Sequence, residues 1–367
     1  PGAADDEANQ AEKEAREERD INVSVYEIFP IRQWDRWRDD MQTHLFVQEA
    51  RAGAKAKDLL AGTQLIEAAG FAGTPTRSGD SLNPAWSSDG KSLVFNATTN
   101  LDEAAHARVK YHLYSVPVAG GEPEQITDSD DWSCHNPMFS NDGKALYCEY
   151  EPENEYVYNL NGVARFGWSR KGIRGELNVI TSSFDRSVTG MDLSDDGKTI
   201  YLTAADAGRS RIYSVPAKGG PVKTLDPESR GVYSGIAVAG NQLVARWQSS
   251  AVPAEIVLID PSKGSHSNLS QFNVERAAGL DRPAFLEFWF ESDKGRMIHN
   301  WLALPAGFDE SKKYPLVLQI HGGPFSSSMD SSHVRWSSGL MAAPGYVVLM
   351  TDYTGSVGYG EEFSRNI

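Results

Sequence analysis

Basic side chains are scarce in this chain of 367 residues, and the shortage excludes a class of partner. Lysine and arginine number 35 against 50 aspartates and glutamates, which leaves a formal net charge of −15. A nucleic-acid partner requires a basic footprint that neutralises phosphates, so we expect none. The same negative charge would attract a positively charged substrate end, such as the amino terminus of a peptide.

Long apolar runs are also missing. No segment approaches the roughly 18 apolar residues of a membrane-spanning helix, and the first residues lack the basic-then-apolar pattern of a signal peptide. We therefore expect no membrane segment. The compartment stays open between cytoplasmic and exported, because the native start of the protein is not evident from the sequence.

Cysteine is limited to Cys134 and Cys148, which flank one strand-like segment without CxxC or metal-ligand spacing. We favour two buried thiols over the alternative, a disulfide, which would indicate an oxidising compartment. The 8 histidines form no HExxH motif or paired spacing. We therefore predict no metal site, and we expect these histidines on the surface or as hydrogen-bonded core residues.

A repeat occupies most of the chain, over residues 21–280. One hairpin pattern, with an Asp-Gly turn between two short strands, recurs three times at intervals of about 50 residues: Pro84–Lys91, Pro137–Lys144 and Gly190–Lys198. A second pattern, Tyr-Ser-Val-Pro followed by Gly-Gly, occurs in Leu113–Gly121 and Ile212–Gly220. Four short strands per unit predict β-propeller blades. We expect about four blades and part of a fifth, with an incomplete first blade that begins in or before Val23–Phe29.

Carboxylates within and beside the repeat have two readings each. Asp89, Asp142 and Asp196 suggest calcium, but a role in the turns explains all three at once. One interpretation of the acidic run Glu149–Glu155 is a site that binds a substrate amino terminus. The other, which we favour, is a solvated loop. Residues 1–20 hold almost no large apolar side chain, so we expect an exposed charged helix or a mobile loop there.

A different pattern occupies residues 281–367. Leu286–Pro305 predicts a long hairpin around Asp293–Gly295, and Tyr314–Ile320 predicts a strand buried on both faces. Next come a helix in Ser332–Ala343, a strand in Tyr346–Met350 and a helix start in Glu361–Ile367. We expect Asp330 and His333 to stabilise the start of this helix rather than to act as metal ligands. This order predicts the front part of an α/β-hydrolase domain.

The glycine turn His321–Pro324 follows the apolar strand Tyr314–Ile320. Such turns bring a backbone N–H close to a developing oxyanion, because glycine has no Cβ in the way. The alternative is a tight turn that only ends the strand. We favour the oxyanion role because His321 precedes the glycines and a second glycine loop, Gly355–Gly360, follows the next strand.

These motifs resemble a known family. Lys313–Phe325 and Gly345–Phe363 are similar to the prolyl oligopeptidase family of serine peptidases, above all to its dipeptidyl peptidase V and acylaminoacyl peptidase branch. The resemblance implies a β-propeller that caps an α/β-hydrolase domain. It also implies that the N–H of Gly323 or Gly322 donates to the oxyanion. His321 stands where some members carry tyrosine, and we expect it to be structural.

Two departures from the family pattern stand out. Thr354 occupies a position where arginine is common, which puts any role of that arginine in doubt. No serine has glycine at both −2 and +2, so the chain lacks the G-x-S-x-G nucleophile elbow. The family order Ser, Asp, His would place the triad beyond Ile367. We therefore expect this chain to be inactive alone and to require the remaining part of the catalytic domain, in the same or a separate chain.

The resemblance implies a serine exopeptidase that releases dipeptides or acyl-amino acids from the N-terminus of short peptides, without a cofactor. The alternatives are a non-catalytic propeller that binds protein partners and an esterase of the same fold. The sequence leaves open whether the protein forms a homo-oligomer.

Overall fold

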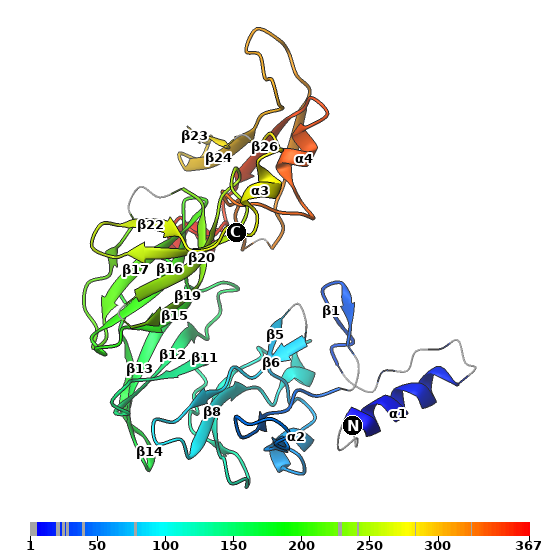
Figure 1. Cartoon of the computed structure of the whole chain (residues 1–367), viewed down its shortest axis with the longest axis vertical. Helices are drawn as coiled ribbons and strands as arrows, with labels where there is room; N and C mark the ends of the chain where they lie inside the picture. The colour runs from blue at the N-terminus through cyan, green and yellow to red at the C-terminus, as the bar shows by residue number, and fades with distance from the viewer. Residues whose placement is uncertain are drawn as a thin grey trace. The chain divides into compact units, whose positions relative to one another are not determined.

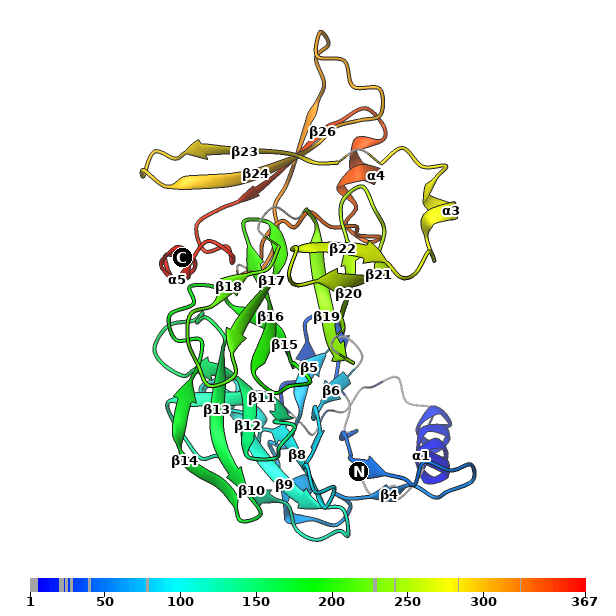
Figure 2. The ribbon, with the colours of Figure 1, turned by 60° about the vertical axis from the view of Figure 1, so that its left-hand side comes forward.

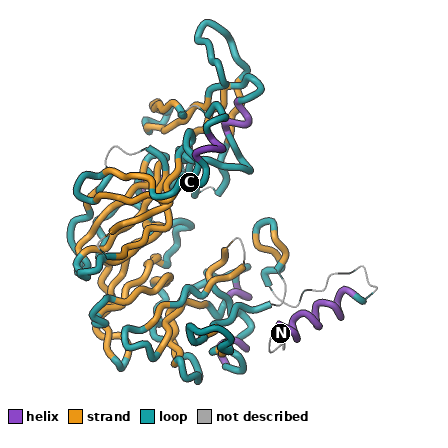
Figure 3. Tube along the Cα trace, in the orientation of Figure 1, coloured by secondary structure: helices purple, strands orange, loops and turns teal. Residues whose placement is uncertain are grey.

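The computed structural model describes residues 6–19, 23, 26, 29–38, 41–76, 79–226, 230–240, 242–282, 284–323 and 325–367. Most of the predicted strand in Val23–Phe29, and Pro324 of the glycine turn, lie outside the described residues. The chain divides into two compact units, each rich in strands (Figure 3). The first unit is Pro1–Glu153 with Phe166–Glu176, and the second is Asn154–Arg165 with Leu177–Ile367. The domain boundaries near residues 20 and 280 stay predictions.

Helix α1 (Asp6–Glu17) lies in the charged first segment, for which the sequence left open an exposed helix or a mobile loop. Arg16 Nε lies 3.2 Å from Glu12 Oε1, and Lys13 Nζ lies 4.0 Å from Glu17 Oε1, both one turn apart. Such pairs support a solvated helix by only a few tenths of a kcal/mol each. No helix among the described residues is both long and apolar enough to cross a bilayer.

Short elements follow α1 in the first unit. They are β1 (Arg32–Gln33), β2 (Arg36–Trp37), β3 (Phe46–Val47), β4 (Lys57–Asp58), α2 (Gln64–Glu67), β5 (Thr74–Thr76), β6 (Gly79–Ser81) and the 3₁₀ turn η1 (Leu101–Glu103). The six strands pair as three two-stranded hairpins. Where the incomplete first blade is expected, β3 has only two residues, and among the described strands it pairs with β4 alone.

Four-stranded antiparallel meanders make up the middle of the chain (Figures 1 and 2). In chain order they are β7 (Ala85–Trp86), β8 (Ser92–Ala97), β9 (His112–Pro117) and β10 (Glu124–Gln125); β11 (Trp132–Phe139), β12 (Ala145–Pro152), β13 (Gly162–Ser169) and β14 (Gly172–Val179); β15 (Val188–Leu193), β16 (Thr199–Asp206), β17 (Arg209–Pro216) and β18 (Lys223–Thr224); and β19 (Val232–Ala239), β20 (Gln242–Gln248), β21 (Glu255–Asp260) and β22 (Ser265–Asn268). One parallel pairing, Ser210 with Val232, joins the last two groups. Every sheet in the described part of the chain is open.

Repeated turns explain why these strands form hairpins. At each Asp-Gly turn the glycine has a positive φ between 66° and 69°, which only glycine adopts without strain. A serine hydroxyl donates to the aspartate at 2.8–2.9 Å, and the lysine N–H donates to the same carboxylate. These bonds lower the pKa of each aspartate, the serine bond most strongly. The turn role of Asp89, Asp142 and Asp196 is confirmed.

Separate apolar clusters stabilise the two units. In the first unit Leu60, Phe95 and Val116 are fully buried between β8, β9 and the short elements. In the second unit Ile212, Tyr233 and Val257 fill the centre of the β15–β22 sheet. Val257 alternates with less buried neighbours along β21, as in a half-buried antiparallel strand, whereas Phe95 lies within a run of buried residues on β8.

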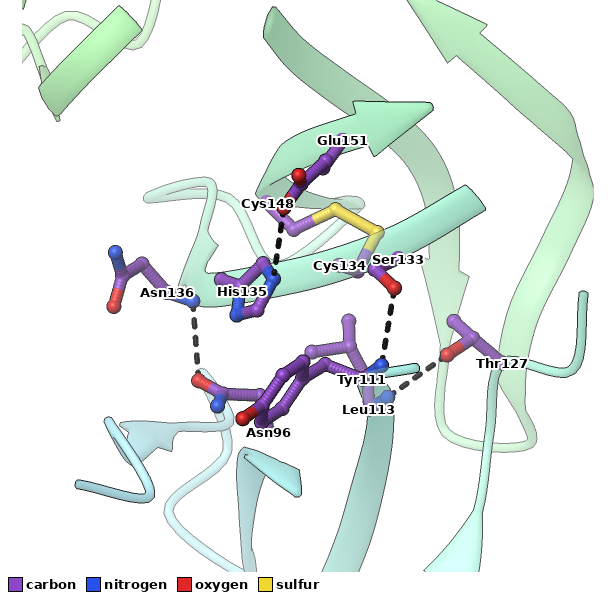
Figure 4. Close-up of a disulfide and its surroundings, with 10 residues drawn as sticks. All are labelled: Asn96, Tyr111, Leu113, Thr127, Ser133, Cys134, His135, Asn136, Cys148 and Glu151. Carbon is purple, nitrogen blue, oxygen red and sulfur yellow. Dashed lines mark hydrogen bonds and ion pairs between the residues drawn. A yellow bond between two sulfur atoms is a disulfide. The ribbon is translucent and has the colours of Figure 1, made fainter. Parts of the chain in front are cut away.

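Cys134 and Cys148 form a disulfide across the β11–β12 hairpin (Figure 4), so the prediction of two thiols was wrong. Their Cα atoms lie 5.7 Å apart, within the range that a disulfide spans. Cys134 lies opposite Tyr150 in the β11–β12 register, and Cys148 is two residues from Tyr150, so the two cysteine side chains lie on one face of the hairpin. Sequence spacing alone does not reveal that register.

Reducing this disulfide should lower the free energy of unfolding by about 3 kcal/mol, the loop-closure value for a link that spans about 15 residues. Urea unfolding with and without reductant measures the difference, and the double variant Cys134→Ser, Cys148→Ser should match the reduced protein. Equal midpoints together with two titratable thiols in the unreduced, unfolded protein would contradict this assignment.

The acidic segment after Cys148 is a strand rather than a solvated loop. Glu149 to Pro152 continue β12, and Glu149 Oε2 accepts a 2.8 Å hydrogen bond from Asn136 Nδ2. Burial raises the pKa of Glu149 and of Glu151 and lowers the pKa of His135 to about 4. His135 Nε2 lies 3.8 Å from Glu151 Oε2 (Figure 4). The solvated-loop prediction is therefore wrong for these two glutamates.

The last sheet has the order β23-β24-β26-β25. Its strands are β23 (Leu286–Glu291), β24 (Met297–Ala303), β25 (Leu316–Gln319) and β26 (Val347–Asp352), with helices α3 (Val274–Ala277), α4 (Ser338–Ala342) and α5 (Glu361–Arg365) nearby in the sequence. β23 and β24 form the predicted hairpin, β26 is antiparallel to β24, and β25 is parallel to β26. The helix start in Glu361–Ile367 is confirmed, whereas α4 is shorter than predicted.

β25 is not buried on both faces, which corrects its prediction. Leu316 and Leu318 are 60% and 50% exposed. On the opposite face Val317 packs with Ala342 of α4, and Gln319 Oε1 accepts a hydrogen bond from Ser338 Oγ at 2.9 Å. Ser338 and Ala342 both belong to α4, which therefore lies on the face of β25 that carries Val317 and Gln319. The face with Leu316 and Leu318 is exposed, so the strand is more apolar than its burial requires.

Candidate oxyanion turn and its support

Gly322 and Gly323 lie at the carboxyl end of β25, where β25 runs parallel to β26. Gly323 has φ +135°, and a Cβ built there would lie 2.6 Å from Phe325 N. Only glycine fits this position. A Cβ on Gly322 would meet no atom within 4 Å, and the φ of Gly322 lies outside the positive range that favours glycine. Position 323 therefore requires glycine, whereas position 322 does not.

The backbone N–H groups of this turn are available. Both glycines are exposed, and among the hydrogen bonds of the described residues neither N–H donates. The carbonyl of Gly322 lies 3.2 Å from His321 Nδ1. An exposed N–H without a partner at the end of a parallel strand is the kind of donor that stabilises a developing oxyanion.

His321 fastens the start of the turn to the next loop. Its Nε2 lies 2.9 Å from Ser356 Oγ, and its ring stacks on Tyr353 with centroids 4.5 Å apart. Tyr353 Oη in turn donates to the His321 carbonyl at 2.8 Å. These contacts use the ring as an anchor, which accords with the expected structural role.

The segment after the turn is anchored at several points. Phe325 stacks on Tyr158 at 5.1 Å, and Ser326 O accepts a 3.1 Å hydrogen bond from Val357 N. Ser328 N donates to Asp352 Oδ1 at 2.6 Å, while Ser328 O accepts from Trp301 Nε1 at 3.0 Å. The backbone beyond Gly323 therefore has little freedom to shift.

Asp330 ends this segment and does not begin a helix, contrary to the prediction. Its buried carboxylate accepts three hydrogen bonds from β19–β20 backbone and side chain: Gly231 N at 3.0 Å, Ser250 N at 3.0 Å and Ser250 Oγ at 2.6 Å. Its own N–H donates to Gly208 O at 2.7 Å. Asp330 thus fixes the chain after the turn to the β15–β22 sheet.

A buried polar network lies beneath the turn. His299 of β24 is fully buried between Glu287 Oε1, 3.1 Å from Nε2, and Asp352 Oδ2, 3.2 Å from Nδ1. Tyr359 Oη lies 2.8 Å from His299 Nδ1 and donates to Asp352 Oδ2. Burial, and then the charge of Asp352, raises the pKa of Tyr359, so its hydroxyl stays protonated.

Arg209 completes the network from the start of β17. Its guanidinium forms two hydrogen bonds with Glu287, at 3.0 and 2.5 Å, and lies over the Trp301 ring at 5.0 Å. The hydrogen bonds lower the pKa of Glu287 and raise the pKa of Arg209. Both groups are therefore charged at neutral pH.

Sequence reasoning missed His299 and Asp352, because neither belongs to a spaced motif. One usable signal was Asp352, a carboxylate at the carboxyl end of an apolar strand, where functional groups of α/β sheets collect. The sequence signal at His299 was weaker, since a single histidine within a strand is ordinarily a core residue. Thr354, the position of the family arginine, lies 3.5 Å from Arg296 Nη1. Among the described residues no cluster of three His, Cys, Asp or Glu side chains fits a metal ion.

Known proteins resemble this chain over most of its length. No family model matches it. Dipeptidyl-peptidase 5 of Aspergillus fumigatus is 26% identical over 94% of this chain and 50% of its own length, and dipeptidyl-peptidase 5 of Porphyromonas gingivalis is 23% identical over 91% and 47%. The chain thus spans about half the length of these relatives.

A solved structure supports the same relationship at the level of fold. Acylaminoacyl peptidase of Pyrococcus horikoshii aligns with a TM-score of 0.58 and 22% identity, over 77% of this chain and 41% of that protein. Together with the named relatives, this match agrees with the motifs around the glycine turn. Over most of its own length, and about half of theirs, the chain is similar to peptidases of the prolyl oligopeptidase family.

Proposed function

We propose that this chain is part of a serine exopeptidase that releases dipeptides or acyl-amino acids from the N-terminus of short peptides. The observation that carries the proposal is the pair of exposed N–H groups at Gly322 and Gly323, which donate to no described residue and follow β25, with Gly323 in a conformation that favours glycine. In this reading Gly323, or Gly322, donates one hydrogen bond to the tetrahedral oxyanion. The triad serine, aspartate and histidine lie outside this chain.

The proposed architecture is a β-propeller over residues 21–280 followed by part of an α/β-hydrolase domain over residues 281–367. The repeated four-stranded meanders support the first part, and the mixed sheet β23–β26 with its glycine turn supports the second. Short peptides fit such an enzyme because a propeller restricts access to the site. The net charge of −15 favours substrates with a free, positively charged amino terminus.

In this mechanism the chain contributes correctly placed N–H donors from the glycine turn. A serine attacks the peptide carbonyl, and the N–H groups of the turn stabilise the negative charge that develops on its oxygen. Each such donor typically contributes a factor of about 10² to 10³ in rate.

Activity of the full-length gene product tests the proposal. We expect labelling by a serine-directed fluorophosphonate and turnover of dipeptide or acyl-amino-acid anilides, whereas residues 1–367 alone should neither label nor turn over. A full-length protein that does not label supports a binding scaffold instead. Turnover of esters without any amide turnover identifies an esterase.

A further inference from the structure

His299 and Asp352 are fully buried, yet neither takes part in the proposed acyl transfer. Buried ionisable groups cost several kcal/mol unless they are paired and hydrogen-bonded. Retaining four ionisable side chains in contact, Arg209, Glu287, His299 and Asp352, therefore calls for a specific arrangement of hydrogen bonds. That arrangement connects β17 to the glycine turn.

The hydrogen bonds run in one direction through the network. Arg209 donates twice to Glu287, and Glu287 Oε1 accepts from His299 Nε2 at 3.1 Å. Because the Tyr359 hydroxyl donates to Asp352, its oxygen is free to accept from His299 Nδ1 at 2.8 Å. Both ring nitrogens of His299 therefore have a polar partner within hydrogen-bond distance.

Asp352 is where this network meets the turn. Its Oδ2 faces Tyr359 and His299, while its Oδ1 accepts the N–H of Ser328 at 2.6 Å and lies 3.5 Å from His321 Nε2. His321 immediately precedes the two glycines, and Ser328 lies five residues beyond Gly323. One carboxylate therefore accepts a hydrogen bond from Ser328 after the turn and lies close to His321 before it.

We propose that Asp352, oriented by His299 and Tyr359, is a positioning residue that sets the direction of the Gly322 and Gly323 N–H groups. The inference rests on the proposed function. Oxyanion donors must lie within about 2.7–3.1 Å of the developing charge, and a misplacement of about 1 Å costs on the order of 10²-fold in rate. The Arg209–Glu287 pair, through His299, fixes the carboxylate that holds the turn.

Asp352→Asn is the decisive variant because it keeps the shape of the side chain. If its NH₂ group faces the Ser328 N–H, two donors oppose each other; if it faces Tyr359, the Tyr359 hydroxyl loses the oxygen that accepts its hydrogen bond and must turn. We expect the ¹H–¹⁵N resonances of Gly322, Gly323 and Ser328 to move in residues 1–367, and the Ser328 amide to exchange at least about 10-fold faster. His266→Gln is the control, since His266 Nδ1 pairs with Tyr233 Oη at 2.6 Å and forms no hydrogen bond with the described residues of the turn. Unchanged glycine and Ser328 resonances in Asp352→Asn would overturn the proposal.

Kinetics of the full-length protein provide the second readout. We expect Asp352→Asn to lower kcat by about 10- to 100-fold with KM within about 3-fold, because the turn acts on the transition state. Tyr359→Phe, which deletes a single hydroxyl, should give a smaller loss of the same kind and serves if Asp352→Asn folds poorly. A wild-type kcat in both variants overturns the positioning role. An inactive wild-type enzyme refutes the proposed function instead, and the resonances then decide the positioning role alone.

Discussion

Replacing Gly323 by alanine should lower kcat of the full-length enzyme by about 10²- to 10³-fold, the value of one oxyanion donor. At φ +135° an alanine is strained, and its Cβ would lie 2.6 Å from Phe325 N. The turn must therefore reorganise, and the N–H groups must move with it. Steady-state kinetics on the same substrates used to establish activity give the measurement.

Gly322→Ala is the matched control for this prediction. Its Cβ meets open space, its φ needs no glycine, and the substitution keeps the backbone N–H. We expect kcat to stay within about 10-fold of the wild-type value. Equal losses in the two variants would show that bulk near the substrate, rather than the conformation of Gly323, controls the rate.

Gly208→Ala should be a strongly destabilising glycine substitution in the second unit. Gly208 lies between β16 and β17 with φ +68°, and its added Cβ would lie 2.4 Å from Trp301 Nε1 and 2.9 Å from Ser328 O. Both neighbours are held by the hydrogen bond between them. The strain of a positive φ costs about 1–2 kcal/mol, and overpacking adds about 1–3 kcal/mol.

Gly197→Ala separates these two contributions. Gly197 has φ +69°, and a Cβ there has no atom within 4 Å. Urea unfolding of residues 1–367 should therefore show a loss of about 1–2 kcal/mol for Gly197→Ala and about 1–3 kcal/mol more for Gly208→Ala. Similar losses in both variants would mean that the contact between the β16–β17 turn and Trp301 contributes little to stability.

Local patterns in the sequence predicted local structure well. The Asp-Gly turns and the β23–β24 hairpin depend on residues within one or two turns of the chain, and both are confirmed. The predictions that failed depend on distant partners. Whether Glu149 is solvated, whether Leu318 is covered and whether Cys134 meets Cys148 are decided by which strand or helix lies against each residue.

The candidate site shows the same difference between local patterns and distant partners. Glycine at position 323 was recognisable because a strand end, a histidine and two glycines are adjacent in the chain. The support beneath it was not, since Arg209, Glu287, His299 and Asp352 come from four different strands. No spacing rule joins residues so far apart in sequence.

The sequence by itself determined the repeat, its turns, the family resemblance and the position of the candidate glycine turn, because each depends on contiguous residues whose conformational preferences are local. Only the tertiary structure decided the disulfide, the burial of the acidic strand and the network that holds Asp352 against Ser328. Those features depend on strand register and on hydrogen bonds between distant segments, and a buried charge is stable only where folding brings its partners into contact.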